Sequence, residues 1–122
     1  MTLKPMVMEF GVGTDIRGEN YTKAAVRALE NALRHNSISI ADALGKRRED
    51  MQVKILIGVA KPDEVDAAAV AAVLPYGQAE VRVVEGGLDT PLESGEGAVV
   101  MANAGLTVYL DVDEDRNVGG TS

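Results

Sequence analysis

The chain has 122 residues, with 19 acidic and 12 basic side chains, and its net charge of −7 argues against nucleic-acid binding, which depends on neutralising phosphates. It contains no cysteine, which excludes disulfides and thiolate metal sites, and its length suits one domain. No apolar run approaches the roughly 20 residues that span a bilayer, and residues 1–5 lack the layout of a secretory signal, so we expect a cytoplasmic protein with no membrane partner.

The apolar periodicity predicts strands and helices in the order β-α-β-α-β-β-β. The first helix is the clearest element: Asn20 is placed to cap it, and Ala25, Ala28, Leu29 and Ala32 form its apolar stripe. We expect strands over residues 6–12, 53–59, 79–85, 98–102 and 106–112, the last two on either side of a turn at 103–105, and helices over 21–35 and 62–74.

Three further segments complete the expected organisation. Residues 36–50 are predicted as either a short helix or an irregular excursion. Residues 1–5 are expected to be disordered, and so is the acidic, glycine-rich segment 113–122, which has almost nothing to bury. The single domain therefore spans residues 6–112.

Two helices cannot cover both faces of a five-stranded sheet, so the fold class is predicted as α/β (α+β), a two-layer sandwich with both helices on one face of a mixed sheet. The strand over 53–59 carries Ile55 and Ile57 on one side and Leu56 on the other, so neither face of the sheet has the polar side chains of a solvent-exposed surface. We therefore expect a homo-oligomer, a dimer or a closed ring such as a trimer, in which a second copy covers the other face.

The glycine-bearing loop from Gly11 to Gly18 follows the first strand. It does not complete a dinucleotide fingerprint, because Ile16 stands where the third glycine belongs, and no cofactor is predicted. Two interpretations remain open. Arg17 and the backbone N–H groups at the helix start hold an anion, or Asp15 simply caps the turn while Arg17 is solvated.

Other chemistry is limited to carboxylates. Glu85 ends an apolar strand beside Gly86 and Gly87, where partial burial would raise its pKa, and Asp15 is the second acid–base candidate. The chain has one histidine, His35, at the end of a predicted helix, so no metal site is predicted.

The run Gly11, Gly13, Asp15 and Gly18 resembles the N-terminal signature G-x-G-x-D-x-H-G of a Lin-type family of conserved hypothetical proteins from bacteria and plants, with Arg17 in the histidine position. The similarity extends over about residues 8–112. This family has no assigned activity, so the resemblance implies a shared site and no chemistry. A more distant similarity, carried by the Gly-Gly pair, is to the repeat unit of ring-opening cyanuric acid and barbiturate hydrolases; there Glu85 stands where those units have serine.

The sequence predicts a homo-oligomer that binds a small anionic or carbonyl-rich molecule at a subunit interface through the Gly11–Gly18 loop. One alternative is a hydrolase-like enzyme with carboxylate acid–base catalysis, and another is an interaction module with no small-molecule site. The candidate catalytic residues are Asp15 and Glu85, and the candidate ligand-binding residues are Gly11, Gly13, Asp15, Arg17, Gly18, Gly86, Gly87 and Asn103.

Overall fold

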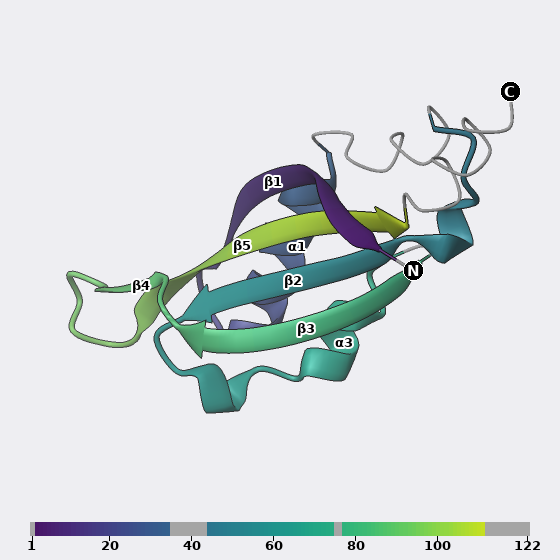
Figure 1. The fold of residues 1–122 in the computed structure, drawn as a ribbon. Helices are drawn as coiled ribbons and strands as arrows, with labels where there is room; N and C mark the ends of the chain where they lie inside the picture. The colour runs from purple at the N-terminus through teal and green to yellow at the C-terminus, as the bar shows by residue number, and fades with distance from the viewer. Residues whose placement is uncertain (1, 35–43, 75–76, 112–122) are drawn as a thin grey trace, which may run out of the picture.

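The computed structural model describes residues 2–34, 44–74 and 77–111. It is a two-layer sandwich of a mixed five-stranded sheet with helices on one face, which confirms the predicted fold class and element order (Figure 1). The elements are β1 Leu3–Asp15, α1 Tyr21–Leu33, the 3-10 helix η1 Arg48–Asp50, β2 Gln52–Val59, the 3-10 helix η2 Pro62–Glu64, α3 Ala67–Ala71, β3 Gln78–Glu85, β4 Leu88–Pro91 and β5 Ala98–Asp111.

The sheet has the strand order β1-β5-β2-β3, and the short β4 pairs with the beginning of β5. β2 and β3 are parallel neighbours, and β5 runs antiparallel to β1, β2 and β4. As a consequence β1, β2 and β3 all point the same way, and their carboxyl ends meet at one end of the sheet (Figure 1). We call this end, where the chain leaves β1 at Asp15 and β3 at Glu85, the carboxyl end of the sheet.

The strands are longer than the sequence suggested. β1 begins at Leu3 and pairs with β5 from there, so residues 3–5 belong to the sheet and not to a disordered segment. The turn expected at residues 103–105 is also wrong, because β5 is one continuous strand held by β1 on one side and β2 on the other. The fifth strand is instead β4, which lies between the strands expected over residues 79–85 and 98–102. Residues 35–43 and the segment 113–122 lie outside the described residues.

Helix α1 is close to its prediction. The Asn20 side chain accepts a hydrogen bond from the N–H of Lys23 at 2.9 Å, and all four residues of the expected apolar stripe are buried. The second predicted helix is two pieces, because Val65 is extended and Asp66 caps a new helix by accepting from the N–H groups of Ala68 and Ala69. None of the helices within the described ranges is long and apolar enough to cross a membrane.

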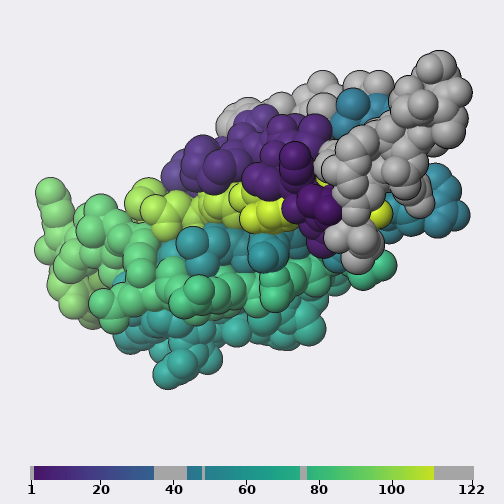
Figure 2. All heavy atoms as spheres, in the orientation of Figure 1, coloured from purple at the N-terminus to yellow at the C-terminus, as the bar shows by residue number. Residues whose placement is uncertain are grey.

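The core lies between the sheet and the helices, and no helix of the described residues covers the opposite face of the sheet, which we call the outer face. Figure 2 looks onto this face, with β1, β5, β2 and β3 side by side and none of the helices in the described ranges in front of them. Phe10 is 63% exposed, Met8 60% and Leu56 47%. Side chains that are apolar enough to build a core therefore face outward from the centre of the sheet.

Candidate functional site

The predicted site residues divide between the two faces of the sheet near its carboxyl end. Gly11 and Gly13 lie on the helix face of β1 and are buried. Asn103 lies on the outer face of β5, directly opposite Val12 of β1 and Gly58 of β2. The structure therefore does not bring all the predicted ligand-binding residues into one pocket, and the two groups have separate roles.

Gly11 and Gly13 let helix α1 lie directly on β1. A Cβ atom at Gly13 would stand 2.3 Å from the backbone nitrogen of Ala28 and 2.5 Å from the carbonyl oxygen of Ala24. One at Gly11 would stand 2.4 Å from the backbone of Ala28 and Ala32. These contacts give both glycines a packing role and leave no space for a ligand between β1 and the helix.

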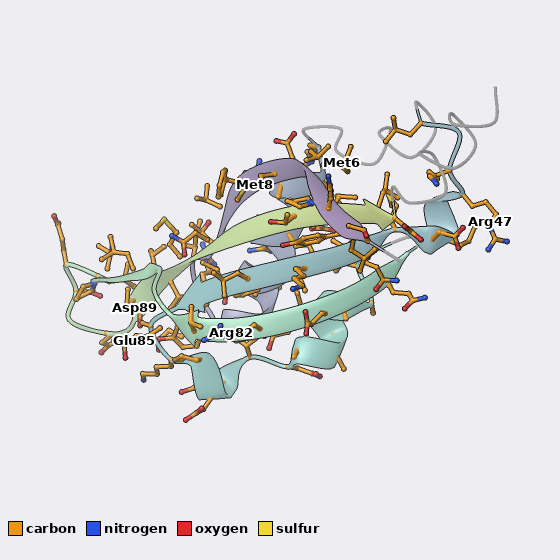
Figure 3. All side chains as sticks on the ribbon, viewed as in Figure 1. Met6, Met8, Arg47, Arg82, Glu85 and Asp89 are labelled. Carbon is orange, nitrogen blue, oxygen red and sulfur yellow. The ribbon has the colours of Figure 1, made fainter. Side chains whose placement is uncertain are left out.

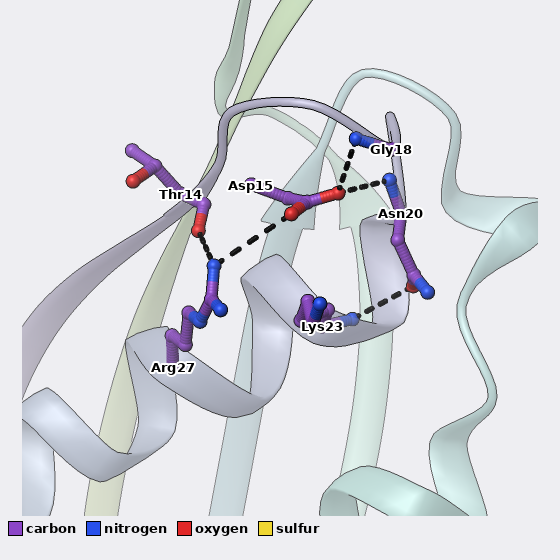
Figure 4. A network of polar contacts seen from close by, with 6 residues as sticks. All are labelled: Thr14, Asp15, Gly18, Asn20, Lys23 and Arg27. Atoms are coloured by element: carbon purple, nitrogen blue, oxygen red, sulfur yellow. Dashed lines mark hydrogen bonds and ion pairs between the residues drawn. The ribbon is translucent and has the colours of Figure 1, made fainter.

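Asp15 closes the turn between β1 and α1 (Figure 4). The residue is 5% exposed, and its Oδ2 accepts hydrogen bonds from the N–H groups of Gly18 at 3.1 Å and Asn20 at 2.9 Å. The Nη1 of Arg27 lies 3.7 Å from its Oδ1 and donates to the carbonyl of Thr14 at 2.6 Å. The carboxylate thus caps the turn, as one of the two open interpretations of this loop proposed.

The same contacts hold Asp15 in its ionised form. The hydrogen bond from the N–H of Asn20 is the largest cause that lowers the pKa of Asp15; burial opposes it, and Lys23, the N–H of Gly18 and Arg27 lower the pKa further. A carboxylate with a lowered pKa is ionised at neutral pH and is a weak proton donor there. The geometry therefore favours an anchoring role over acid–base catalysis for this residue.

The variant Asp15→Asn is expected to be less stable than the wild type at pH 7, and the difference is expected to shrink as the pH falls below about 3.8. Because the folded state lowers the pKa of Asp15, its contribution is present above the unfolded value of about 3.8 and is lost as the pH falls through the folded value. Urea unfolding of both proteins between pH 7 and pH 3 measures this. A stability difference that stays constant over that range would contradict the role given to the carboxylate.

Arg17 is the accessible cation of this loop. It is exposed, and within the described part of the chain it forms no ion pair. The next residues are constrained: a Cβ at Gly18 would stand 3.0 Å from Oδ2 of Asp15, and Glu19 adopts a positive φ of 47°. The turn therefore holds Arg17 at the carboxyl end of the sheet with its guanidinium free to contact a ligand or a second chain.

On the outer face, three glycines and one amide pack closely together. A Cβ at Gly58 would stand 2.4 Å from Oδ1 of Asn103, and one at Gly86 would stand 3.1 Å from the Cα of Gly58. Gly87 has a φ of +62°, and a Cβ there would stand 2.2 Å from the carbonyl oxygen of Met101. The chain thus crosses over the end of β2 between β3 and β4, and only glycine fits at the crossing.

This crossing borders a hollow of about 370 Å³ on the outer face, which we call the Asn103 hollow. It brings together three of the predicted site residues, Glu85, Gly86 and Asn103, with apolar neighbours that the sequence did not assign to a site. Within the described residues the Asn103 side chain has no hydrogen-bond partner, so its amide offers one donor group and one acceptor. The lining residues are Phe10, Leu56, Gly58, Val84, Glu85, Gly86, Asn103, Ala104 and Gly105.

A partly buried pair at the same end of the sheet has no signal in the sequence. Tyr21, the first residue of α1, is 3% exposed and donates its hydroxyl hydrogen bond to Oδ2 of Asp89 on β4. The other carboxylate oxygen of Asp89 is buried without a partner in the described part of the chain. Burial first, and then Asp89, raise the pKa of Tyr21 to about 12, so the phenol is protonated at neutral pH. The pair ties α1 to β4, and Glu85 and Asp89 mark this region in Figure 3.

Comparison with known proteins gives a match to one family and matches to several solved structures. The profile of the Lin0512 family, described as conserved hypothetical proteins, matches residues 5–108. A solved FtsZ-like protein of unknown function from Nostoc punctiforme PCC 73102 is similar at 29% identity, with a TM-score of 0.81 over 91% of this chain and 98% of that chain. No curated protein matches the chain. The family match confirms the Lin-type resemblance seen in the glycine-bearing loop.

Proposed function

The chain belongs to the Lin0512 family of conserved hypothetical proteins, and from this premise we propose that it is a self-associating protein that binds a small anionic or carbonyl-rich molecule at its subunit interface. The outer face of the sheet is the interface, and the Asn103 hollow is the binding crevice. The observation that carries this proposal is the exposure of large apolar side chains on one face of the sheet while the helices cover the other face (Figure 1).

The outer face has the apolar composition of a protein–protein interface. Alternate residues of β1 place three exposed apolar side chains on this face: Met8, Phe10 and Val12. Gly105 of β5 pairs with Phe10 on one side and with Leu56 of β2 on the other, so these two side chains flank a position without a side chain. Monomeric soluble proteins rarely expose contiguous apolar patches of this kind, and larger ones mark interaction sites. A second copy of the chain carries the same patch, so the contact is self-complementary in character.

The Asn103 hollow combines apolar walls with few polar groups, which is the usual layout of a small-molecule site. The Asn103 amide can donate to a ligand carbonyl or carboxylate from inside this apolar surface. Arg17 lies at the same end of the sheet but outside the lining of the hollow, and its exposed guanidinium can bind a carboxylate in a bidentate manner. These two groups favour a ligand with a negative charge or several carbonyl oxygens.

Binding needs no proton transfer, and this separates it from the hydrolase-like alternative. Asp15 is occupied in capping the turn, and Glu85 lies exposed at the end of β3. The residues predicted for acid–base catalysis therefore do not converge on one position, whereas Asn103 and the glycine crossing do.

A thermal-shift screen tests the binding crevice. Small carboxylates, inorganic phosphate, ureas and heterocyclic amides are the probes, and at least one is expected to raise the melting temperature of the wild type by a few degrees. Asn103→Ala is expected to abolish this shift, while Gln78→Ala, a change at another exposed polar residue of the sheet, leaves it intact. A shift that survives in Asn103→Ala would exclude the hollow, and a screen without any shift would favour the interaction-module alternative.

A further inference from the structure

The two edges of the sheet, β1 and β3, differ in whether their outward backbone groups are hydrogen-bonded. Along β1, helix α1 covers the free edge with polar side chains: Asn31 Oδ1 accepts from the N–H of Val12 at 3.0 Å, and Arg27 donates to the carbonyl of Thr14 at 2.6 Å. Side chains that occupy edge groups in this way prevent the pairing of another strand. The β1 edge is therefore closed near its carboxyl end.

The β3 edge is open. The N–H group of Gln78 donates to the carbonyl oxygen of Met51, and that of Gly86 donates to the carbonyl oxygen of Val59, both at 2.9 Å. The even-numbered residues of β3 therefore direct their N–H and C=O groups toward β2. The odd-numbered residues, Ala79, Val81, Val83 and Glu85, therefore direct their N–H and C=O groups away from the sheet. Within the described part of the chain no hydrogen bond reaches these outward groups. Such a row of unpaired groups is a template for another strand.

We infer that β3 pairs antiparallel with β3 of a second copy, about a two-fold axis at Val81. This contact is distinct from the outer face and joins the two sheets edge to edge. Ala79 would then face Val83 and Val81 would face Val81, which forms about six backbone hydrogen bonds in an antiparallel ladder. Because the two-fold axis is perpendicular to the sheet, the outer faces of both copies lie on the same side.

The charges on β3 select this register. With the axis at Val81, Glu80 stands directly opposite Arg82 of the second copy, and the pair occurs twice. Moving the axis by one residue places Glu80 opposite Glu80 or Arg82 opposite Arg82, and like charges directly opposite destabilise a strand pair. Both side chains are exposed and form no ion pair within the described residues, so each is available to the partner. Figure 3 labels Arg82 on β3, the strand that forms this edge.

The helix beneath the edge leaves room for a second copy. Helix α3 packs against the helix-facing side of β3 through Val70, which is fully buried. Its exposed side chains are small, since Ala67 and Ala68 are alanines and Ala72 caps its end. Two such helices can approach each other closely across the axis, because no long side chain on either one projects into the gap.

Disulfide trapping tests the inference, because the chain has no cysteine of its own. Purified Glu80→Cys and Arg82→Cys proteins are mixed and oxidised, and intact-mass measurement counts the cross-linked dimers. Positions 80 and 82 of opposite copies form a non-hydrogen-bonded pair about 4.5 Å apart at Cα, within disulfide range. The mixture is expected to give at least about tenfold more dimer than either variant alone, since position 80 meets its own copy only diagonally, at about 7–8 Å.

The control mixture pairs Glu80→Cys with Gln78→Cys, which are not opposite in this register and are expected to give little dimer. Dimer yields that are equal in all mixtures, or no dimer in any of them, would overturn the inference. Repeating the trapping with Phe10→Asp in both chains separates this contact from the proposed function. The edge pairing predicts that the disulfide persists, even when association through the outer face is lost.

Discussion

Gly13→Ala is expected to destabilise the protein by about 3 kcal/mol or more, and at worst to prevent folding. The added Cβ would lie 2.3 Å from the nitrogen of Ala28 and 2.5 Å from the oxygen of Ala24. Both are backbone atoms of α1, so no side-chain rotation relieves the contact and the whole helix must move away from β1. Equilibrium urea unfolding, or the soluble yield if the variant does not fold, measures this effect.

Gly105→Ala is the matched control for this substitution. Gly105 lies in β5, next to β1, but a Cβ there would meet only the Phe10 ring, at an ordinary contact distance of 3.7 Å. Its unfolding free energy is expected to stay within about 1 kcal/mol of the wild type. If both variants proved equally stable, the close approach of α1 to β1 would not be what Gly13 provides.

Phe10→Asp is expected to weaken self-association by a factor of about 30 or more, the loss that follows from removing a central interface anchor. The Phe10 side chain is 63% exposed in the single chain, so the substitution leaves the core intact. In the associated state, however, it would bury a carboxylate in the middle of an apolar contact. Sedimentation velocity over a range of concentrations, with Arg82→Glu in every chain to block the β3 edge contact, measures the change.

Phe10→Leu is the control for this second prediction. Leucine keeps the apolar surface and is expected to retain most of the association. Urea unfolding of both Phe10 variants at a concentration where the chain is monomeric is expected to resemble the wild type. Association of Phe10→Asp at the wild-type strength would show that the outer face is not the contact surface.

The elements that the sequence predicted well are those with local signals. Asn20 and the alanine stripe of α1 define a helix with no information from the rest of the chain. By contrast, Asn103-Ala104-Gly105 has the composition of a turn, and only pairing with β1 and β2 on both sides makes it part of one strand. Similarly, Pro62 is a correct start signal, but the break at Val65 depends on Thr22 of α1, whose Oγ1 accepts from the N–H of Asp66 at 2.8 Å.

The candidate site shows the same division. Glycines are typical of positions where another group comes close to the backbone, but whether a ligand or a helix approaches Gly13 depends on where α1 crosses β1. Gly58 joins the Asn103 hollow only through the register of β2 with β5, which no local pattern reveals. Tyr21 and Asp89 are 68 residues apart in the sequence, and nothing in either neighbourhood connects them.

Sedimentation equilibrium of the Arg82→Glu chain tests most directly whether another copy covers the outer face. The substitution places a second carboxylate opposite Glu80 of the second copy, and this repulsion blocks the edge contact, so that any remaining association is through the outer face. The mass is expected to be at least twice the 12.8 kDa of one chain and to fall on adding Phe10→Asp. A mass of 12.8 kDa at every concentration would contradict the account.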